Sequence, residues 1–320
     1  MPRAELEAKL QTLGYQAWDQ EISWPAIEAW AANFTGRALK KDDEQLHCLF
    51  ALTRFMYFGK RMMREMLKAL YRDHFEAPLI QRIRRNLGGT RDEALLRNQF
   101  EIEAKSTRFL GMGNPAESGA HLLYYFRQVN YLAKDQFVDI NAAFTPKIKR
   151  SRATETVVLE PRESGVSRYV FFDDLVGSGT QATDYLSQSL AAIRRGGWKI
   201  DLKFMCLFAT STGLQKMNEP SMFDGNAISL FELDDTYRAF SDSSRYFLSA
   251  PDWFVPANFR AIALKYGAIL QPARPLGYKD GQLMLGFSHN TPDNTLPIFW
   301  DEGTLVPWSP TFLRFDKNYN

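Results

Sequence analysis

Apolar residues recur at helical spacing in the first third of the chain. Between residues 42 and 72 their separations are three, four or seven positions, which keeps them near one face of a helix. They are Leu49, Leu52, Met56, Met63, Leu67 and Leu70. Gly88 and Gly89 interrupt this pattern, and Thr90 is placed to cap a further helix. The pattern predicts a helical region over residues 1–100.

From about residue 104, short apolar runs alternate with glycine-containing turns and amphipathic stretches. These predict strands at residues 109–112, 168–172, 200–208 and 228–233, and helices at residues 120–130 and 180–195. Strands that alternate with helices indicate a parallel sheet, whose ligands bind beyond the carboxyl ends of the strands. We therefore expect an α/β fold with a parallel-sheet core, divided into an N-terminal helical region (1–100) and one α/β domain (101–320).

The composition is that of a globular protein with a sizeable core: of 320 residues, 45% are hydrophobic and 24% are charged. Disorder, collagen-like repeats and a dominant coiled coil are excluded. No apolar run approaches the roughly 20 residues that span a bilayer, and the first ten residues lack an apolar signal core. Cys48 and Cys206 are too far apart for a metal site and too few for a disulfide framework. We expect a cytoplasmic protein without membrane contact.

Positive charge is concentrated in one segment, although the formal net charge is only +2. Residues 54–97 hold 11 Lys and Arg against 5 Asp and Glu, whereas residues 1–53 hold 5 against 8. A solvated helix face accounts for such a segment. A surface that binds nucleic acid and one that binds an acidic partner protein are the alternatives.

One predicted strand and the turn after it carry the sharpest chemical signal. The strand ends in two adjacent carboxylates, Asp173 and Asp174, and residues 177–180 read Gly-Ser-Gly-Thr at the start of the next helix. The glycines permit a tight turn whose N–H groups face an anion, and the helix adds the positive end of its dipole. Two carboxylates favour polyol hydroxyls or a divalent cation. A sugar phosphate satisfies both halves, while a purely structural turn before a capped helix has the same elements.

Residues 173–180 resemble the signature of the phosphoribosyltransferase family, in which an acidic pair precedes a phosphate loop. The resemblance implies that Asp173 and Asp174 hold the ribose hydroxyls during catalysis. It implies phosphate binding by the residues that follow, which are Gly177, Ser178, Gly179, Thr180 and Gln181. Gln181 departs from the family, which usually has Thr there. The implied ligand is phosphoribosyl pyrophosphate or a nucleotide, and the implied cofactor is Mg²⁺.

An earlier turn corresponds to the pyrophosphate loop of the same family. It follows the first predicted strand and contains Asn114, Ser118 and Gly119, which the resemblance assigns to pyrophosphate. Glu117 opposes this role, because a carboxylate repels pyrophosphate. An ordinary helix capped by Ser118 is the alternative.

Basic residues gather between these two motifs, in a region without an evident apolar pattern. In the family, a mobile loop here closes over the site, and cations would clamp the leaving pyrophosphate. The basic residues are Lys147, Lys149, Arg150 and Arg152. A solvated charged loop is the alternative.

The last third of the chain contains a turn-rich run at residues 288–297, with two prolines and a histidine in a polar setting. His289 is expected to act as a general acid or base, or to contact the base of a nucleotide. Together with the segments around Glu117 and Phe172, residues 289–300 are similar to divergent phosphoribosyltransferase-like proteins of bacterial conflict systems, some associated with retrons. That resemblance implies an effector of antiviral defence.

Functions of different classes follow from these patterns. One is an enzyme that displaces a group at the anomeric carbon of a ribose phosphate or nucleotide. Another is a non-catalytic sensor, whose pocket binds a nucleotide and controls association with a partner. A third is a nucleic-acid-associated subunit of a defence complex, which would use residues 54–97.

Overall fold

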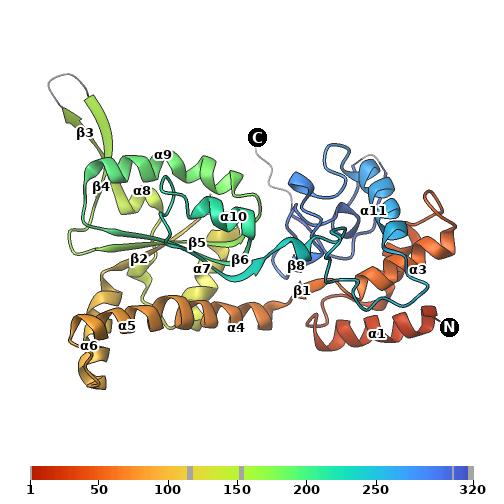
Figure 1. The fold of residues 1–320 in the computed structure, drawn as a ribbon, viewed down its shortest axis with the longest axis horizontal. Coiled ribbons are helices and arrows are strands. Elements are labelled where there is room, and N and C mark those ends of the chain that lie inside the picture. The colour runs from red at the N-terminus through yellow and green to blue at the C-terminus, as the bar shows by residue number, and fades with distance from the viewer. Residues whose placement is uncertain (1, 114–117, 151–154, 305, 316–320) are drawn as a thin grey trace. The chain divides into compact units, whose positions relative to one another are not determined.

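The computed structural model describes residues 2–113, 118–150, 155–304 and 306–315 (Figure 1). The chain forms two compact units, each with its own hydrophobic core. The first unit comprises Met1–Met63 and Leu233–Asn320, and the second comprises Arg64–Glu232. The boundary expected at residue 100 lies inside the second unit, within helix α6.

The first unit combines segments from both ends of the chain. Its elements are α1 (Pro2–Gln16), α2 (Trp24–Ala32), α3 (Lys41–Leu52), β1 (Met56–Phe58), the start of α4 (Lys60–Tyr71), η3 (Asp235–Tyr237), α11 (Pro256–Leu270), η4 (Tyr278–Asp280), β8 (Leu285–Phe287) and η5 (Pro297–Phe299). Strands β1 and β8 pair in parallel, with Met56 opposite Leu285. The buried ring of Trp30 stacks on Phe299 at a centroid distance of 5.5 Å. These contacts join the two segments around one core.

The helical pattern of residues 42–72 is broken in the middle. Helix α3 ends at Leu52, and residues 56–58 form β1 before α4 begins at Lys60. The aromatic pair Tyr57-Phe58 favours a strand, and pairing with β8 satisfies its backbone. The helical spacing of residues 42–72 therefore spans two helices with a short strand between them.

The second unit holds a four-stranded sheet and the helices that cover it. Its remaining elements are η1 (Arg72–Glu76, a π-helical turn), α5 (Ala77–Asn86), α6 (Glu93–Lys105), β2 (Thr107–Gly111), α7 (Ser118–Val129), η2 (Lys134–Gln136), α8 (Ile140–Ala143), β3 (Phe144–Arg150), β4 (Glu155–Pro161), β5 (Arg168–Val176), α9 (Thr180–Gly196), β6 (Asp201–Thr210), α10 (Ser211–Met217) and β7 (Ala227–Leu233). Helix α6 starts after its cap Asp92, whose carboxylate accepts the Leu95 N–H, rather than after Thr90.

The sheet has the strand order β2-β5-β6-β7. Strands β2, β5 and β6 run parallel, with Thr107 opposite Arg168 and Arg168 opposite Asp201. Their first residues therefore align at one edge of the sheet and their carboxyl ends at the other. The α/β class, the parallel sheet and the helical N-terminal region are confirmed.

Helices cover both faces of this sheet. Neighbouring residues of a strand point to opposite faces, so Phe171 and Phe172 identify the two layers. Phe171 belongs to the core formed with α9, which includes Leu186 and Leu190. Phe172 packs instead against Phe126 of α7, with ring centroids 5.3 Å apart. None of the described helices is long and apolar enough to cross a bilayer.

Candidate functional site

The carboxyl ends of the parallel strands bring three connecting segments to one edge of the sheet. Gly111, the last residue of β2, lies opposite Phe172, and Val176, the last of β5, lies opposite Ala209. The Met112 N–H also donates to the Phe172 carbonyl at 2.9 Å. The segments after β2, β5 and β6 therefore leave the sheet on the same side.

Residues 177–179, called the anion loop below, connect β5 to α9. Gly179 has a φ of 69°, a left-handed conformation that glycine adopts without steric cost. The Ser178 hydroxyl donates to Thr180 Oγ1 at 3.0 Å, and Thr183 Oγ1 donates to the Gly179 carbonyl at 2.7 Å. Because that carbonyl is bound within the first turn of α9, the loop leads directly into the helix N-terminus. Such a turn suits an anion.

The two aspartates lie within β5, ahead of its end at Val176. Asp173 Oδ1 accepts the Asp174 N–H at 2.9 Å, and Asp174 Oδ1 accepts the Leu175 N–H at 2.8 Å. Each of these bonds uses one of the two oxygens of its carboxylate. Strand alternation directs Asp173 to the α9 face and Asp174 to the α7 face. The carboxylates are thus adjacent in sequence without lying side by side.

A buried thiol lies next to the acidic pair. Cys206 of β6 is opposite Asp173 and is fully buried. Burial raises the pKa of the Cys206 thiol, and the negative charges of Asp173 and Asp174 raise it further. The thiol therefore stays protonated and donates to the Ile228 carbonyl at 3.7 Å, so it does not provide a nucleophile.

Helix α10 lies against the anion loop, and the sequence patterns did not predict this contact. The Thr210 hydroxyl donates to the Gly177 carbonyl at 2.6 Å and accepts the Gly213 N–H at 3.0 Å. A Cβ atom placed on Gly213 would lie 2.3 Å from the Gly177 carbonyl oxygen. Only glycine permits this approach. The available signal was the run of small polar residues directly after the apolar strand β6.

The other predicted phosphate-binding residues sit at the start of α9. Thr180 is its first residue, and Gln181 follows with an exposed side chain. The five predicted phosphate-binding residues are consecutive in the chain and connect β5 to the first turn of α9. Their role in binding stays a prediction.

The segment after β2 is described only in part. Asn114 and Glu117 lie outside the described residues, and Ser118 and Gly119 begin α7. The Tyr185 hydroxyl of α9 donates to the Gly113 carbonyl at 3.2 Å. This bond ties the start of the segment to the helix that follows the anion loop. A pyrophosphate-binding role for this turn stays a prediction.

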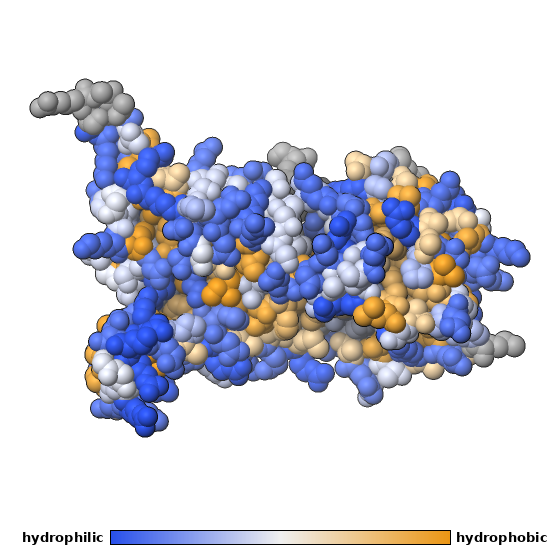
Figure 2. Space-filling view, in the orientation of Figure 1, coloured by the Kyte–Doolittle hydropathy of each residue, from blue (hydrophilic) through white to orange (hydrophobic). Residues whose placement is uncertain are grey.

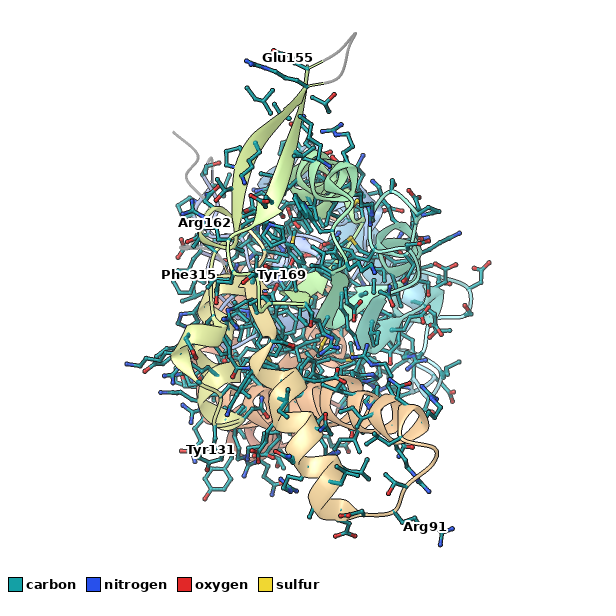
Figure 3. The ribbon with its side chains drawn as sticks, turned by 90° about the vertical axis from the view of Figure 1, so that its left-hand side faces the viewer. Arg91, Tyr131, Glu155, Arg162, Tyr169 and Phe315 are labelled. Atoms are coloured by element: carbon teal, nitrogen blue, oxygen red, sulfur yellow. The ribbon has the colours of Figure 1, made fainter. Side chains whose placement is uncertain are left out.

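Three of the basic residues between the motifs, Lys147, Lys149 and Arg150, lie on β3 of the β3–β4 hairpin, away from the anion loop. The hairpin runs from its base near Arg162 and Tyr169 to Glu155, and hydrophilic residues cover much of it (Figures 2 and 3). Lys147 pairs with Glu160, and Arg150 pairs with Glu155.

Lys149 shows which end of α9 this hairpin approaches. Its ammonium donates to the Gly196 carbonyl at 2.7 Å, at the last residue of α9. A helix of 17 residues is about 25 Å long, and the anion loop precedes its first residue. The expected clamp over the site is therefore not formed by the described cations. Arg152 lies outside the described residues.

His289 belongs to the first unit, whereas the aspartates and the anion loop belong to the second. Its ring stacks on Phe287 at a centroid distance of 5.3 Å. The run that follows is largely buried and hydrogen-bonded, with Thr295 Oγ1 donating to the Leu285 carbonyl at 2.6 Å. Most of this run has a structural role, and catalysis by His289 stays a prediction.

The residues present fit a magnesium ion that is shared with a substrate. Among the described residues, no cluster of three or more His, Cys, Asp or Glu could hold a metal by itself. Mg²⁺ usually binds through one or two carboxylates and completes its shell with substrate phosphates and water. Asp173 and Asp174 supply donors of that kind.

Comparison with known proteins links most of the chain to one family. The model of the PRTase-CE family matches residues 27–314. A comparison with curated proteins finds no match.

Several solved structures resemble parts of the chain. Orotate phosphoribosyltransferase from Aeropyrum pernix is 16% identical, with 42% of this chain and 64% of that chain covered at a TM-score of 0.25. This chain thus spans less than two thirds of that protein's length. Xanthine-guanine-hypoxanthine phosphoribosyltransferase from Helicobacter pylori is 9% identical, with coverages of 57% and 86% and a TM-score of 0.27. The AQ2163 protein from Aquifex aeolicus is 15% identical, with coverages of 67% and 88% and a TM-score of 0.26.

Proposed function

This chain belongs to the PRTase-CE family, and from that premise we propose that its second unit binds the ribose 5-phosphate group of phosphoribosyl pyrophosphate or a nucleotide and acts at the anomeric carbon. One observation carries the proposal: two carboxylates, a glycine turn and a helix N-terminus follow one another from β5 into α9. The N–H groups of the anion loop and the helix dipole favour the phosphate. The carboxylates accept hydrogen bonds from the ribose hydroxyls.

In the proposed reaction, the bond from the anomeric carbon to the leaving group breaks, and the leaving group takes the electron pair. The leaving atom is an oxygen of pyrophosphate in phosphoribosyl pyrophosphate and a base nitrogen in a nucleotide. A nucleophile then forms the new bond to the same carbon. Between these two steps, positive charge develops on the sugar. Asp173 and Asp174 stabilise this charge electrostatically. Asp174 is only 9% exposed, so water screens its charge little. An aspartate of this pair, together with the substrate phosphates, would hold a Mg²⁺ ion, and that ion would neutralise the charge of a pyrophosphate leaving group.

The test is turnover by a double variant, Asp173→Asn with Asp174→Asn. Phosphoribosyl pyrophosphate, NAD and nucleotides are incubated with the protein and Mg²⁺, and products are identified by mass spectrometry. We expect product with the native chain and none with the double variant, while circular dichroism shows an unchanged fold. The matched control is Asp42→Asn with Asp43→Asn, an exposed pair in the first turn of α3. Equal turnover by the native chain and the site variant contradicts the mechanism.

A second candidate is a nucleotide sensor without turnover. Two observations favour it: both aspartates accept backbone N–H groups of their own strand, and Gln181 replaces the usual Thr. If the chain is a sensor, calorimetry detects binding of the ligand, and mass spectrometry finds no product after the same incubation. Product formation excludes this candidate.

Residues 54–97 are the proposed contact for nucleic acid or a partner protein. Several of their arginines form no ion pair with any described residue, namely Arg84, Arg85, Arg91 and Arg97. Arg91 lies at the turn between α5 and α6 (Figure 3). Binding of RNA or DNA should weaken with salt and with the change of these four residues to Gln. A partner protein is favoured if binding to nucleic acid is absent.

The proposed setting is the bacterial cytoplasm, with the chain as an effector of antiviral defence, in a retron or a related system. The resemblance of residues 289–300 supports the defence role, and two free, buried cysteines agree with a reducing compartment. The test counts phage plaques on bacteria that express the chain with its neighbouring genes. Protection that the Asp173→Asn, Asp174→Asn variant loses supports the proposal, and equal plaque counts without the chain contradict it.

A further inference from the structure

A lysine side chain from α10 lies against the anion loop. Lys216 is in the last turn of this helix, and its aliphatic part runs past Gly179. A Cβ atom placed on Gly179 would lie 3.2 Å from Lys216 Cδ and 3.4 Å from Lys216 Cβ. The ammonium is two bonds beyond Cδ, so it is held within a few bond lengths of the loop.

No described residue neutralises the charge of Lys216. It forms no ion pair with any described residue, in contrast to Lys60, Lys68 and Lys147, which each contact a carboxylate. Its side chain is also partly buried rather than extended into solvent. A partly buried cation without a carboxylate partner suits an anionic ligand.

The position of Lys216 relative to the loop is fixed by the helix that carries it. The Thr210 hydroxyl joins α10 to the Gly177 carbonyl, and Gly213 allows the helix to approach that carbonyl closely. Lys216 follows Gly213 by three positions and therefore lies near the same face of the helix. The fold thus places a full positive charge beside a turn that otherwise offers N–H groups and a helix dipole.

We propose that Lys216 binds the phosphate monoester of the ligand and makes the site selective for a doubly charged phosphate, an inference that rests on the proposed function. A helix N-terminus supplies about half an elementary charge, which leaves a phosphate dianion under-compensated. The ammonium supplies the missing charge as a mobile point donor. A neutral sugar gains no affinity from this ammonium.

The test compares four proteins by isothermal titration calorimetry with phosphoribosyl pyrophosphate and with ribose 5-phosphate: the native chain, Lys216→Met, Lys216→Arg and Lys199→Met. We expect Lys216→Met to weaken both affinities by about 10- to 100-fold, as for loss of a charge-assisted hydrogen bond. Lys216→Arg should restore most of the affinity. Lys199 is an exposed lysine just ahead of β6, at the opposite edge of the sheet, and its variant should bind within twofold of the native chain.

The outcomes separate this inference from the proposed function. If the native chain binds both ligands and Lys216→Met binds them equally well, the role of Lys216 is overturned and the proposed function stands. If the native chain binds neither ligand, the role of Lys216 and the proposed function are both contradicted. A lowered unfolding temperature of ligand-free Lys216→Met without rescue by Lys216→Arg indicates a structural role and also overturns the inference.

Discussion

The Glu44 carboxylate shows how one buried group organises a loop of the first unit. Its oxygens accept N–H groups from Gly36, Ala38 and Leu39 at 2.5–3.0 Å, and the Tyr266 hydroxyl at 2.6 Å. The residue is fully buried, which by itself opposes ionisation. The hydrogen bonds from Tyr266 and the three amides outweigh burial, so the pKa of Glu44 lies below its ordinary value of 4.5.

Glu44→Gln should lower the free energy of unfolding by about 2 kcal/mol at pH 7, because an amide cannot accept all four hydrogen bonds. The folded pKa is lowered, so the contribution of Glu44 is present above pH 4.5 and is lost as pH falls below it. The difference between native chain and variant should therefore shrink in acid. Urea unfolding at pH 7 and pH 3.5 measures it. Glu28→Gln, at an exposed position, should change neither value. A difference that grows in acid contradicts the assignment.

Gly213 is the residue at which a single methyl group tests the anion loop. A Cβ atom there would lie 2.3 Å from the Gly177 oxygen and 2.8 Å from the Val176 oxygen. Both neighbours are backbone atoms, so the loop or α10 must shift. Gly213→Ala should cost about 1–3 kcal/mol of stability and weaken binding of phosphoribosyl pyrophosphate at least tenfold. Gly165→Ala is the control, because nothing lies within 4 Å of its Cβ position. Native affinity in Gly213→Ala would show that the ligand does not use this loop.

At the scale of elements, the edge of the sheet opposite the anion loop is held by charges. Arg168, at the start of β5, donates to Asp201 at 3.1 Å and to Glu103 of α6 at 3.1 Å. Lys203 of β6 donates to the His74 carbonyl in the π-helical turn η1 at 2.5 Å. These bonds attach helices of the N-terminal third to the first residues of the strands. Ion pairs thus stabilise the edge at the first residues of the strands, and the edge at their carboxyl ends carries the candidate site.

Lys203 gives this edge a measurable pH dependence. Burial lowers the pKa of Lys203 from its ordinary 10.5 to about 8; Asp201 opposes the shift, and Arg168 and Arg82 add to it. Between about pH 8 and 10.5 the unfolded chain therefore binds more protons, and the free energy of unfolding should rise with pH. Lys203→Met lacks this contribution. The free energy of unfolding of the native chain minus that of the variant should therefore rise with pH across that range. Chemical denaturation at pH 8 and pH 10 measures it, with Lys199→Met as the control. A flat or falling difference would disprove the shift.

The elements nearest the site are those that local sequence predicts best. Residues 169–172 form a continuous apolar run and residues 180–195 an amphipathic pattern, and the structure has β5 and α9 there. The contacts that were not predicted are between residues that are distant in the chain and close in space. Thr210 and Lys216 approach the anion loop because β6 pairs with β5, and no periodicity encodes strand order. The basic residues of β3 were misplaced for the same reason, since their partners lie across the hairpin and at the far end of α9.

At the scale of the whole molecule, the chain returns to its first unit after completing the second. Residues 1–63 and 233–320 share one core, although the entire second unit separates them in sequence. Hydrophobic periodicity reports only on neighbours within a helix or strand, so it gave one contiguous helical region instead of a unit made from two segments. The pairing of β1 with β8 is the contact that periodicity could not supply.

Separate cores predict separate responses to core truncation. Trp30 is fully buried, donates from its indole N–H to the Ile298 carbonyl at 2.6 Å and stacks on Phe299. Trp30→Ala should therefore destabilise the first unit by about 3–5 kcal/mol. Hydrogen exchange measured by mass spectrometry should accelerate in residues 2–63 and 233–315, while residues 168–217 keep their native rates. Phe171→Ala, in the core of the second unit, should give the reverse pattern. If either variant accelerates exchange equally in both units, they unfold as one cooperative block, since a core that stabilises one unit alone cannot loosen the other to the same extent.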